Sequence, residues 1–258
     1  MSQIVVFHGT EHKAGCTMAA QSVAELIAKE KRDITVLLAA LNGRRSAEYM
    51  NENVVSIDEF KIQLKSGIGI DQNALSANKK IDNLFVISGV SKDEEVRCFL
   101  PGMAEALIET LHNKFDVIII DSGSDLDNGL AFGALKMNGI KYLIMEQAES
   151  SVKRYERMKD NYEKLSICFD KYVLSKYFED DPLTVNYVSS RLGIDKSLFF
   201  TVAHSDKGRI SEIEYRTLLE IGGEKYKNDI LKIVNDIMQA MNLEGIFLKR
   251  KRVWNSFI

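Results

Sequence analysis

The sequence predicts an α/β fold, a doubly wound and mostly parallel sheet flanked by helices, and two observations support this prediction. Several short apolar runs are rich in β-branched residues and do not alternate with polar residues, which is typical of strands buried on both faces of a parallel sheet. Segments with helical periodicity lie between these runs, and this alternation indicates βαβ units. Because 258 residues with 45% hydrophobic content suit one large core, we expect one domain over residues 1–242 and a tail over 243–258.

The strands are predicted where the apolar runs occur. In chain order they are Ile4–His8, Thr35–Ala39, Leu84–Ser88, Val117–Ile120, Tyr142–Met145, Tyr172–Leu174 and Phe199–Ala203. The helices are predicted where apolar residues recur at helical spacing. They are Thr17–Lys29, Ser56–Lys65, Gly102–Asn113, Gly129–Met137, Ser150–Lys164, Thr184–Leu192, Glu212–Ile221 and Lys225–Asn242.

Composition excludes several classes of protein. Charged residues nearly cancel, with a formal net charge of −3, so no overall field attracts nucleic acid, which we do not expect as a partner. The three cysteines are widely spaced and form no CxxC pattern: Cys16, Cys98 and Cys168. This favours a reducing compartment over a disulfide framework. No signal peptide and no run of about 20 apolar residues is present. We therefore expect a cytoplasmic chain that is neither secreted nor integral to a membrane.

The loop after the first predicted strand reads HGTEHKAGCT, residues 8–17, and leads into the helix TMAAQSVAELIAKE. A phosphate-binding loop belongs at such a place, because backbone amides and a helix N-terminus can surround phosphate groups. The general pattern GxxxxGK[ST] is absent. The segment instead resembles the deviant Walker A loop and first helix of the ParA/MinD superfamily, whose fold is of the P-loop NTPase type.

This resemblance implies a set of site residues. Gly15 and Thr17 match the last glycine and the magnesium-binding hydroxyl of the family's loop, whereas Cys16 stands where the phosphate-binding lysine is expected and Glu11 where the signature lysine is expected. The loss of two cations beside a triphosphate removes electrostatic stabilisation on which phosphoryl transfer depends. His12 and Lys13 also occupy positions that the family usually gives to glycine.

Two other loops extend the resemblance. The run FDVIIID, residues 115–121, resembles the family's Walker B-like strand, with Asp121 at the magnesium-linked aspartate. The run VLLAALN, residues 36–42, places alanine and asparagine where the family's VLLIDAD carries two acids. Asp121 then either organises a magnesium–phosphate site or only braces the neighbouring loops.

The predicted cofactor is ATP or ADP with magnesium, or none. A bound nucleotide would contact Gly9, Lys13, Gly15, Cys16, Thr17 and Asp121, with Thr17 and Asp121 also serving the metal. Lys13 could turn inward and replace a missing lysine. The alternative is a strand-to-helix turn that is capped by Thr17 and binds no ligand.

The C-terminal residues 246–258 read IFLKRKRVWNSFI. On a helix the apolar residues fall roughly on one side of the four cations, and a basic amphipathic segment of this type can lie in a membrane interface. The segment also resembles the C-terminal membrane-targeting helix of the MinD branch. Peripheral contact at the inner face of the membrane would then involve Phe247, Lys249, Arg250, Lys251, Arg252, Trp254 and Phe257. The alternative is that the segment packs on the domain itself.

Together these features favour a catalytically degenerate ParA/MinD-like protein, a pseudo-ATPase that acts as a localisation or assembly scaffold and forms a homodimer with itself. The atypical loop resembles that of the TadZ/CpaE branch, which implies a pilus or secretion assembly, although the receiver-like N-terminal domain of that branch is missing here. Two alternatives stay open: a nucleotide-dependent positioning ATPase switch, and a protein–protein adaptor without nucleotide.

Overall fold

A computed structural model of the chain describes residues 2–42, 54–75 and 77–247. Its centre is a sheet in the order β3-β5-β2-β6-β1-β7-β8-β9, in which every neighbouring pair is parallel, while the short β4 pairs antiparallel with β5. The doubly wound, mostly parallel sheet predicted from the sequence is confirmed. The strands are β1 Gln3–Gly9, β2 Val36–Ala40, β3 Val55–Ser56, β4 Ala77–Asn78, β5 Ile81–Ser88, β6 Val117–Asp121, β7 Ile140–Glu146, β8 Lys171–Tyr177 and β9 Phe199–Ala203.

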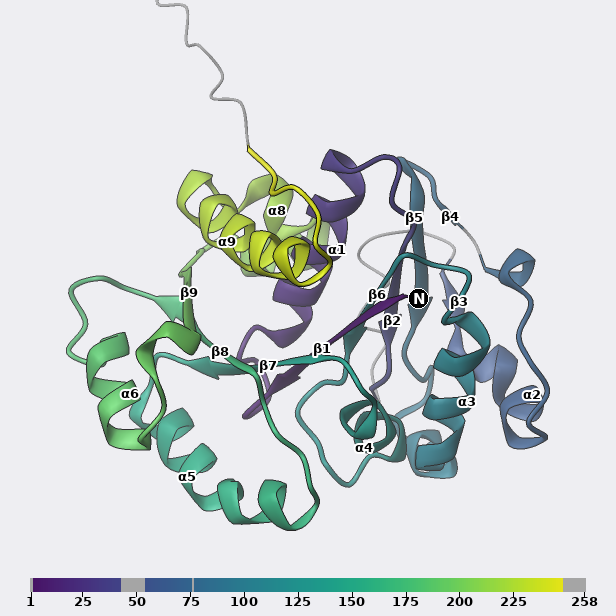
Figure 1. Cartoon of the computed structure of the whole chain (residues 1–258), viewed down its shortest axis with the longest axis horizontal. Helices are drawn as coiled ribbons and strands as arrows, with labels where there is room; N and C mark the ends of the chain where they lie inside the picture. Colours follow the sequence, from purple (N-terminus) through teal and green to yellow (C-terminus); the bar gives the residue numbers. More distant parts are fainter. Residues whose placement is uncertain (1, 43–53, 76, 248–258) are drawn as a thin grey trace, which may run out of the picture.

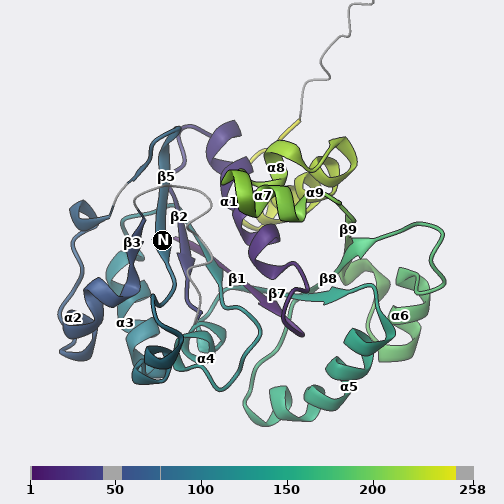
Figure 2. The same cartoon turned by 180° about the vertical axis from the view of Figure 1, so that it is seen from behind.

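Helices cover both faces of this sheet, with α1, α7, α8 and α9 on one face and α3 to α6 on the other (Figures 1 and 2). The α-helices are α1 Cys16–Glu30, α2 Lys61–Lys65, α3 Pro101–Leu111, α4 Gly129–Lys136, α5 Glu149–Lys164, α6 Val185–Leu192, α7 Gly208–Glu214, α8 Leu218–Ile221 and α9 Glu224–Ala240. Short 3₁₀ helices are η2 Ile57–Phe60, η3 Gln72–Ala74, η4 Asp93–Cys98 and η5 Lys196–Leu198. Within the described ranges, no helix is long and apolar enough to cross a bilayer.

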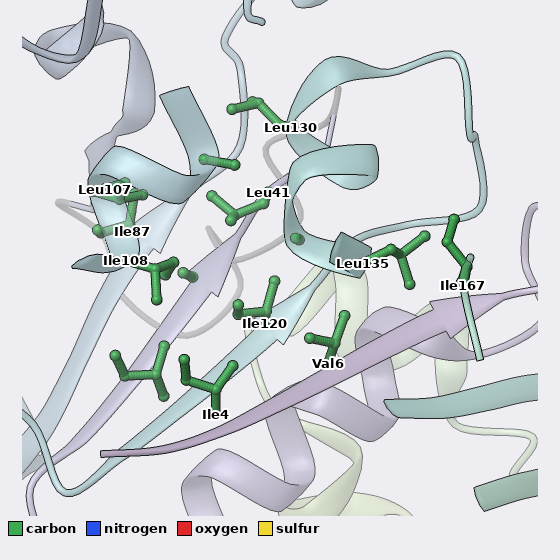
Figure 3. Packing of buried hydrophobic residues seen from close by; sticks show 14 of the residues in the cluster. Ile4, Val6, Leu41, Ile87, Leu107, Ile108, Ile120, Leu130, Leu135 and Ile167 are labelled. Carbon is green, nitrogen blue, oxygen red and sulfur yellow. The ribbon is translucent and has the colours of Figure 1, made fainter. Parts of the chain in front are cut away.

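Two apolar cores lie on either side of the sheet because successive side chains of a strand point to opposite faces. Ile4 and Val6 of β1 pack with Ile120 of β6 in the core beneath α3 and α4, as Figure 3 shows, whereas Val5 and Phe7 pack in the core beneath α1 and α9. This double burial explains why the strands read as unbroken apolar runs in the sequence.

One predicted helix is wrong. The sequence predicted a single helix over Glu212–Ile221, but the structure divides this region into α7 and α8. Tyr215 adopts a left-handed backbone conformation with φ 51°, and Thr217 is extended. A left-handed residue ends a helix, and the side chain of tyrosine gives no sequence signal for it. The predicted helix Ser56–Lys65 also begins as the 3₁₀ helix η2 rather than as an α-helix.

Close packing of α3 against α4 depends on glycine. A Cβ atom added to Gly133 would lie 2.3 Å from the carbonyl oxygen of Pro101 and 2.9 Å from the Cβ of Ala104. These separations are too short for non-bonded atoms, so the backbones of the two helices would have to move apart.

We therefore predict that Gly133→Ala lowers the free energy of unfolding by about 1–3 kcal/mol, as overpacked core substitutions do. The matched control is Gly102→Ala in α3, where an added Cβ would meet no atom within 4 Å and where alanine should be neutral or stabilising by up to about 1 kcal/mol. Urea denaturation of both variants measures the difference. Equal stability of the two variants would contradict the packing described here.

Candidate functional site

A wide cleft with a volume of ≈ 1750 Å³ opens at the carboxyl ends of the strands. Its walls come from the loops after β1, β6, β7, β8 and β9 and from the first turn of α1. This is the edge where open α/β sheets bind ligands, because loops from neighbouring parallel strands converge there. The cleft therefore lies where the sequence placed the candidate site.

The loop after β1 is fixed to its neighbours at its beginning. The Gly9 amide donates to the carbonyl of Gly123, 2.7 Å away, and the Thr10 amide donates to the carbonyl of Ile144, 2.9 Å away. Arg154 of α5 donates from Nε to the Thr10 carbonyl at 2.6 Å. Sequence reasoning missed Thr10 and Arg154, because no motif marks a side chain that reaches the loop from a distant helix.

The end of the same loop is held in left-handed conformations. Lys13 has φ 64° and Gly15 has φ 92°. This agrees with the expectation that Lys13 stands at a position suited to glycine, since non-glycine residues rarely adopt such angles. Ser175 of β8 donates a hydrogen bond to the Ala14 carbonyl, which fixes the backbone just before α1.

The N-terminus of α1 leaves amides directed at the cleft. The helix begins at Cys16 with Gly15 as its N-cap and no side-chain cap. The ligand-free alternative supposed that Thr17 caps the helix. Thr17 does not cap it, because its hydroxyl donates to Asp121 instead. Among the described residues, the amides of Cys16, Thr17 and Met18 have no acceptor. Free amides at a helix N-terminus suit an anion such as phosphate.

Asp121, at the end of β6, is the centre of the site and only 2% exposed. Its carboxylate accepts hydrogen bonds from the Thr17 hydroxyl at 2.7 Å, from the Asn42 amide at 3.0 Å and from the Gly123 backbone amide at 3.1 Å. The Cys16 thiol donates to the same carboxylate at 3.4 Å. The structure thus brings Cys16, Thr17 and Asp121 together as predicted, and adds Asn42.

The electrostatics of the site lack the expected cation. Burial, followed by the nearby Asp121 carboxylate, raises the pKa of the Cys16 thiol well above its ordinary value. Cys16 is therefore neutral at physiological pH and contributes no charge to the cleft. Glu11 also lines the cleft. Lys13 lines it too, with an exposed side chain that makes no ion pair within the described part of the chain.

His12 and His8 connect the loop to the segment after β6 in different ways. His12 is exposed. Its Nδ1 atom lies 3.2 Å from the Ser124 hydroxyl oxygen, and its Nε2 atom lies 3.5 Å from the Asp125 carboxylate. His8 is fully buried, and burial lowers its pKa to about 3. Its Nδ1 lies 2.9 Å from the Ser122 hydroxyl. His8 is thus a neutral, structural side chain under physiological conditions.

A magnesium ion would find only part of its ligand set in the protein. Within residues 2–42, 54–75 and 77–247, no group of three or more His, Cys, Asp or Glu side chains is arranged to hold a metal ion. Thr17 and Asp121, the predicted metal residues, lie together at the cleft. Because Mg²⁺ is commonly held by one or two protein oxygens together with phosphate and water, these two residues fit a magnesium ion that arrives with a nucleotide.

Most of the predicted membrane residues lie outside the described part of the chain. These are Lys249, Arg250, Lys251, Arg252, Trp254 and Phe257. Phe247 is described and is 80% exposed. The preceding Ile246 is buried and held to α9, where Asn235 accepts from its amide at 2.7 Å and donates to its carbonyl at 3.2 Å.

Comparisons with known proteins identify the fold. No model of a protein family matches the chain, and no curated protein matches it. The chain is similar to the ParA family ATPase from Chlorobium tepidum TLS. The alignment covers 90% of this chain and 97% of that protein, with a TM-score of 0.76 and 14% identity. The chain is also similar to the septum site-determining protein MinD of Pyrococcus horikoshii OT3, which was solved with Mg-ADP. The alignment covers 93% of this chain and 98% of that protein, with a TM-score of 0.74 and 14% identity.

A third structure, the MinC:MinD cell division complex of Aquifex aeolicus, contains a chain that matches 96% of this one over 99% of its own length, with a TM-score of 0.72 and 16% identity. At these levels of identity the comparisons show a shared fold. The cleft described above lies within that fold.

Proposed function

We propose that this chain, which has the fold of the ParA/MinD ATPases, is a catalytically degenerate member of that group that serves as a localisation or assembly scaffold. The scaffold would associate with a second copy of itself and with a protein partner. The atypical loop, which resembles that of the TadZ/CpaE branch, favours a pilus or secretion assembly as that partner.

One observation carries this proposal. At the position of the phosphate-binding lysine, Cys16 presents a buried, neutral thiol that is bonded to Asp121. Stabilisation of the charge that develops during phosphoryl transfer requires fixed cations near the transferred group. With Glu11 in place of a second lysine, the loop offers the free amides of α1 and the exposed Lys13 but no buried cation.

The same geometry would still hold a nucleotide weakly. The amides of Cys16, Thr17 and Met18 would contact phosphate oxygens. Thr17 with Asp121 would hold a magnesium ion, whose positive charge would partly offset the negative charge of the phosphates. Asn42 keeps the Asp121 carboxylate oriented toward Thr17. Binding without efficient turnover is therefore the behaviour that the site favours.

The structural neighbours support a role in positioning. The Aquifex aeolicus MinD was solved in a complex with MinC, which is a precedent for a protein of this fold that carries a partner. Two rival functions differ in their use of nucleotide: a positioning switch must bind it and change its assembly state, whereas an adaptor does not bind it.

Isothermal titration with MgATP and MgADP tests the role of Cys16. We predict that the wild-type chain binds with a dissociation constant above about 100 µM and that Cys16→Lys binds at least about tenfold more tightly, because lysine at this position extends into the cleft that Cys16 lines. The matched control, Cys168→Lys, adds the same charge at an exposed cysteine and should leave binding unchanged.

Tight binding by the wild-type chain that Cys16→Lys does not improve would refute the claim that a lost cation limits the site, and would favour the nucleotide-dependent switch. If the wild-type chain does not bind even at millimolar nucleotide, the adaptor is favoured over a scaffold that carries nucleotide. Thermal melting by circular dichroism verifies that each variant is folded.

We also propose that the basic C-terminal segment contacts anionic membrane. The exposed Phe247, directly after the anchored Ile246, supports this because it presents an apolar side chain to solvent next to the basic residues of the sequence. We predict that the full chain sediments with vesicles containing anionic lipid, that added salt weakens this binding, and that a chain ending at Ile246 does not bind. Neutral vesicles are the control. Undiminished binding by the shortened chain would refute the proposed role of the C-terminal segment in membrane binding.

A further inference from the structure

We propose that Arg154 of α5 is a positioning residue for the candidate anion site. Through its hydrogen bond to the Thr10 carbonyl, Arg154 fixes the loop after β1 in the conformation that presents backbone amides to the cleft. Arg154 is not one of the described residues that line the cleft, so it acts on a ligand only through the loop. The inference rests on the proposed function, because it concerns the site in which we propose that a nucleotide is held.

The contact of Arg154 with the loop differs from the contacts of the neighbouring cations of α5. Arg154 donates from Nε to the Thr10 carbonyl at 2.6 Å. Hydrogen bonds from an ionised donor are shorter and roughly twice as strong as neutral ones. Lys153, in contrast, is paired with Glu149 of its own helix at 3.3 Å. Arg157 makes no ion pair and no side-chain hydrogen bond within the described part of the chain.

Thr10 is the residue at which the loop leaves the sheet, and it is only 3% exposed. Its amide donates to the carbonyl of Ile144 at 2.9 Å. Its hydroxyl lies 2.7 Å from the hydroxyl of Ser151, a fully buried residue of α5 that also accepts from the Glu146 amide at 3.1 Å. Together with Arg154, these contacts hold Thr10 by its amide, its side chain and its carbonyl, and two of the three contacts come from the first turns of α5.

The bond to Arg154 also determines which way the next amide points. A peptide group is planar and trans, so its N–H points away from its C=O. Because the Thr10 carbonyl is directed at α5, the Glu11 amide points away from α5. At the other end of the loop, Ser175 donates to the Ala14 carbonyl, which turns the Gly15 amide away from Ser175 in the same manner.

Both of these amides are available to a ligand. The amides of Glu11 and Gly15 have no acceptor among the described residues, and both residues line the cleft. Successive free amides in a loop that includes left-handed residues form an anion-binding concavity. Anchoring the loop by its carbonyls therefore adds two donors to those at the N-terminus of α1.

The loop needs an external anchor because it contains a strained residue. Lys13 has φ 64°, and a non-glycine residue keeps such a conformation only where its surroundings fix it. Arg154 is suited to this task, since a guanidinium does not lose its proton in proteins and the bond to Thr10 persists at every physiological pH.

The helix that carries Arg154 is itself supported from the side away from the loop. Arg191 of α6 donates to Glu149 at 2.7 Å and to Glu156 at 2.8 Å, and these two residues flank Arg154 on α5. In Figures 1 and 2, α5 covers the face of the sheet opposite α1. The loop, which connects the sheet to α1, is thus held from the far face by a residue on a rigid element.

Three substitutions separate the hydrogen bond from the rest of the side chain. Methionine at position 154 has an unbranched chain of similar length and no donor, whereas the amide nitrogen of glutamine lies as many bonds from the backbone as Nε of arginine and can donate. The variants are Arg154→Met and Arg154→Gln. The matched control is Arg157→Met, which removes a cation without a side-chain partner from the same helix. Both arginines are exposed, so no substitution opens a cavity in a core.

Hydrogen exchange measured by NMR in the absence of ligand tests the inference. The amides to follow are those of Thr10 and Ala14, which are bonded to the carbonyls of Ile144 and Glu11. We expect exchange about thirtyfold faster in Arg154→Met, the effect of losing one hydrogen bond to a charged group. Exchange should stay within about fivefold of wild type in Arg154→Gln and be unchanged in Arg157→Met. Amides of α9 should not change in any variant, whereas a general loss of stability would accelerate them.

NMR titration of the same samples with MgADP measures the consequence for the site. We expect Arg154→Met to bind at least about tenfold more weakly than wild type and Arg154→Gln to bind within about threefold of it. Unchanged exchange in Arg154→Met, equal acceleration in Arg154→Gln, or undiminished MgADP binding by Arg154→Met would each overturn the inference. If the wild-type chain binds no MgADP, nucleotide binding by the proposed scaffold is refuted, and the exchange rates alone decide whether Arg154 fixes the loop.

Discussion

The buried carboxylate of Asp121 is the constraint around which the candidate site is arranged. A buried carboxylate is tolerated only when its oxygens are hydrogen-bonded, and Asp121 obtains these bonds from α1, from Asn42 after β2 and from its own following turn. The strand-end loops therefore converge on one side chain. The left-handed turn at Gly15 begins α1 where the Thr17 hydroxyl reaches this carboxylate.

This arrangement keeps the geometry of a phosphate site while changing its charge. The carboxyl group of Asp121 lies at the centre, and Cys16 donates a hydrogen bond to it but supplies no positive charge. Anion binding then depends on amide dipoles, on Lys13 and the other cations that line the cleft (Arg97, Lys176 and Arg209), and on any magnesium ion that arrives with the ligand. For this reason we propose that the chain holds a nucleotide without efficient turnover and serves as a scaffold.

The sequence predicted those elements that are long and buried on both faces, and it missed short elements and long-range contacts. The buried strands of the sheet were predicted because their unbroken apolar runs have one physical cause, burial on both faces. The two-residue strands β3 and β4 were missed because so short a pairing leaves no pattern. Gly15, Thr17 and Asp121 were predicted from a resemblance of motifs, whereas Thr10 and Arg154, which also help to fix the loop, were missed because their contacts join segments distant in the sequence. The break at Tyr215 was missed because a left-handed tyrosine has no sequence signature.

The central claim, that the cleft has lost the charge needed for phosphoryl transfer, is tested most directly by phosphate release from saturating MgATP. We predict no release above that of a matched sample with Asp121→Asn, because without a fixed cation in the loop after β1 the transition state gains little stabilisation beyond that of water and magnesium. Steady release that saturates with ATP and disappears in Asp121→Asn would contradict the claim, and would mean that another cation, with Lys13 as the first candidate, completes the site.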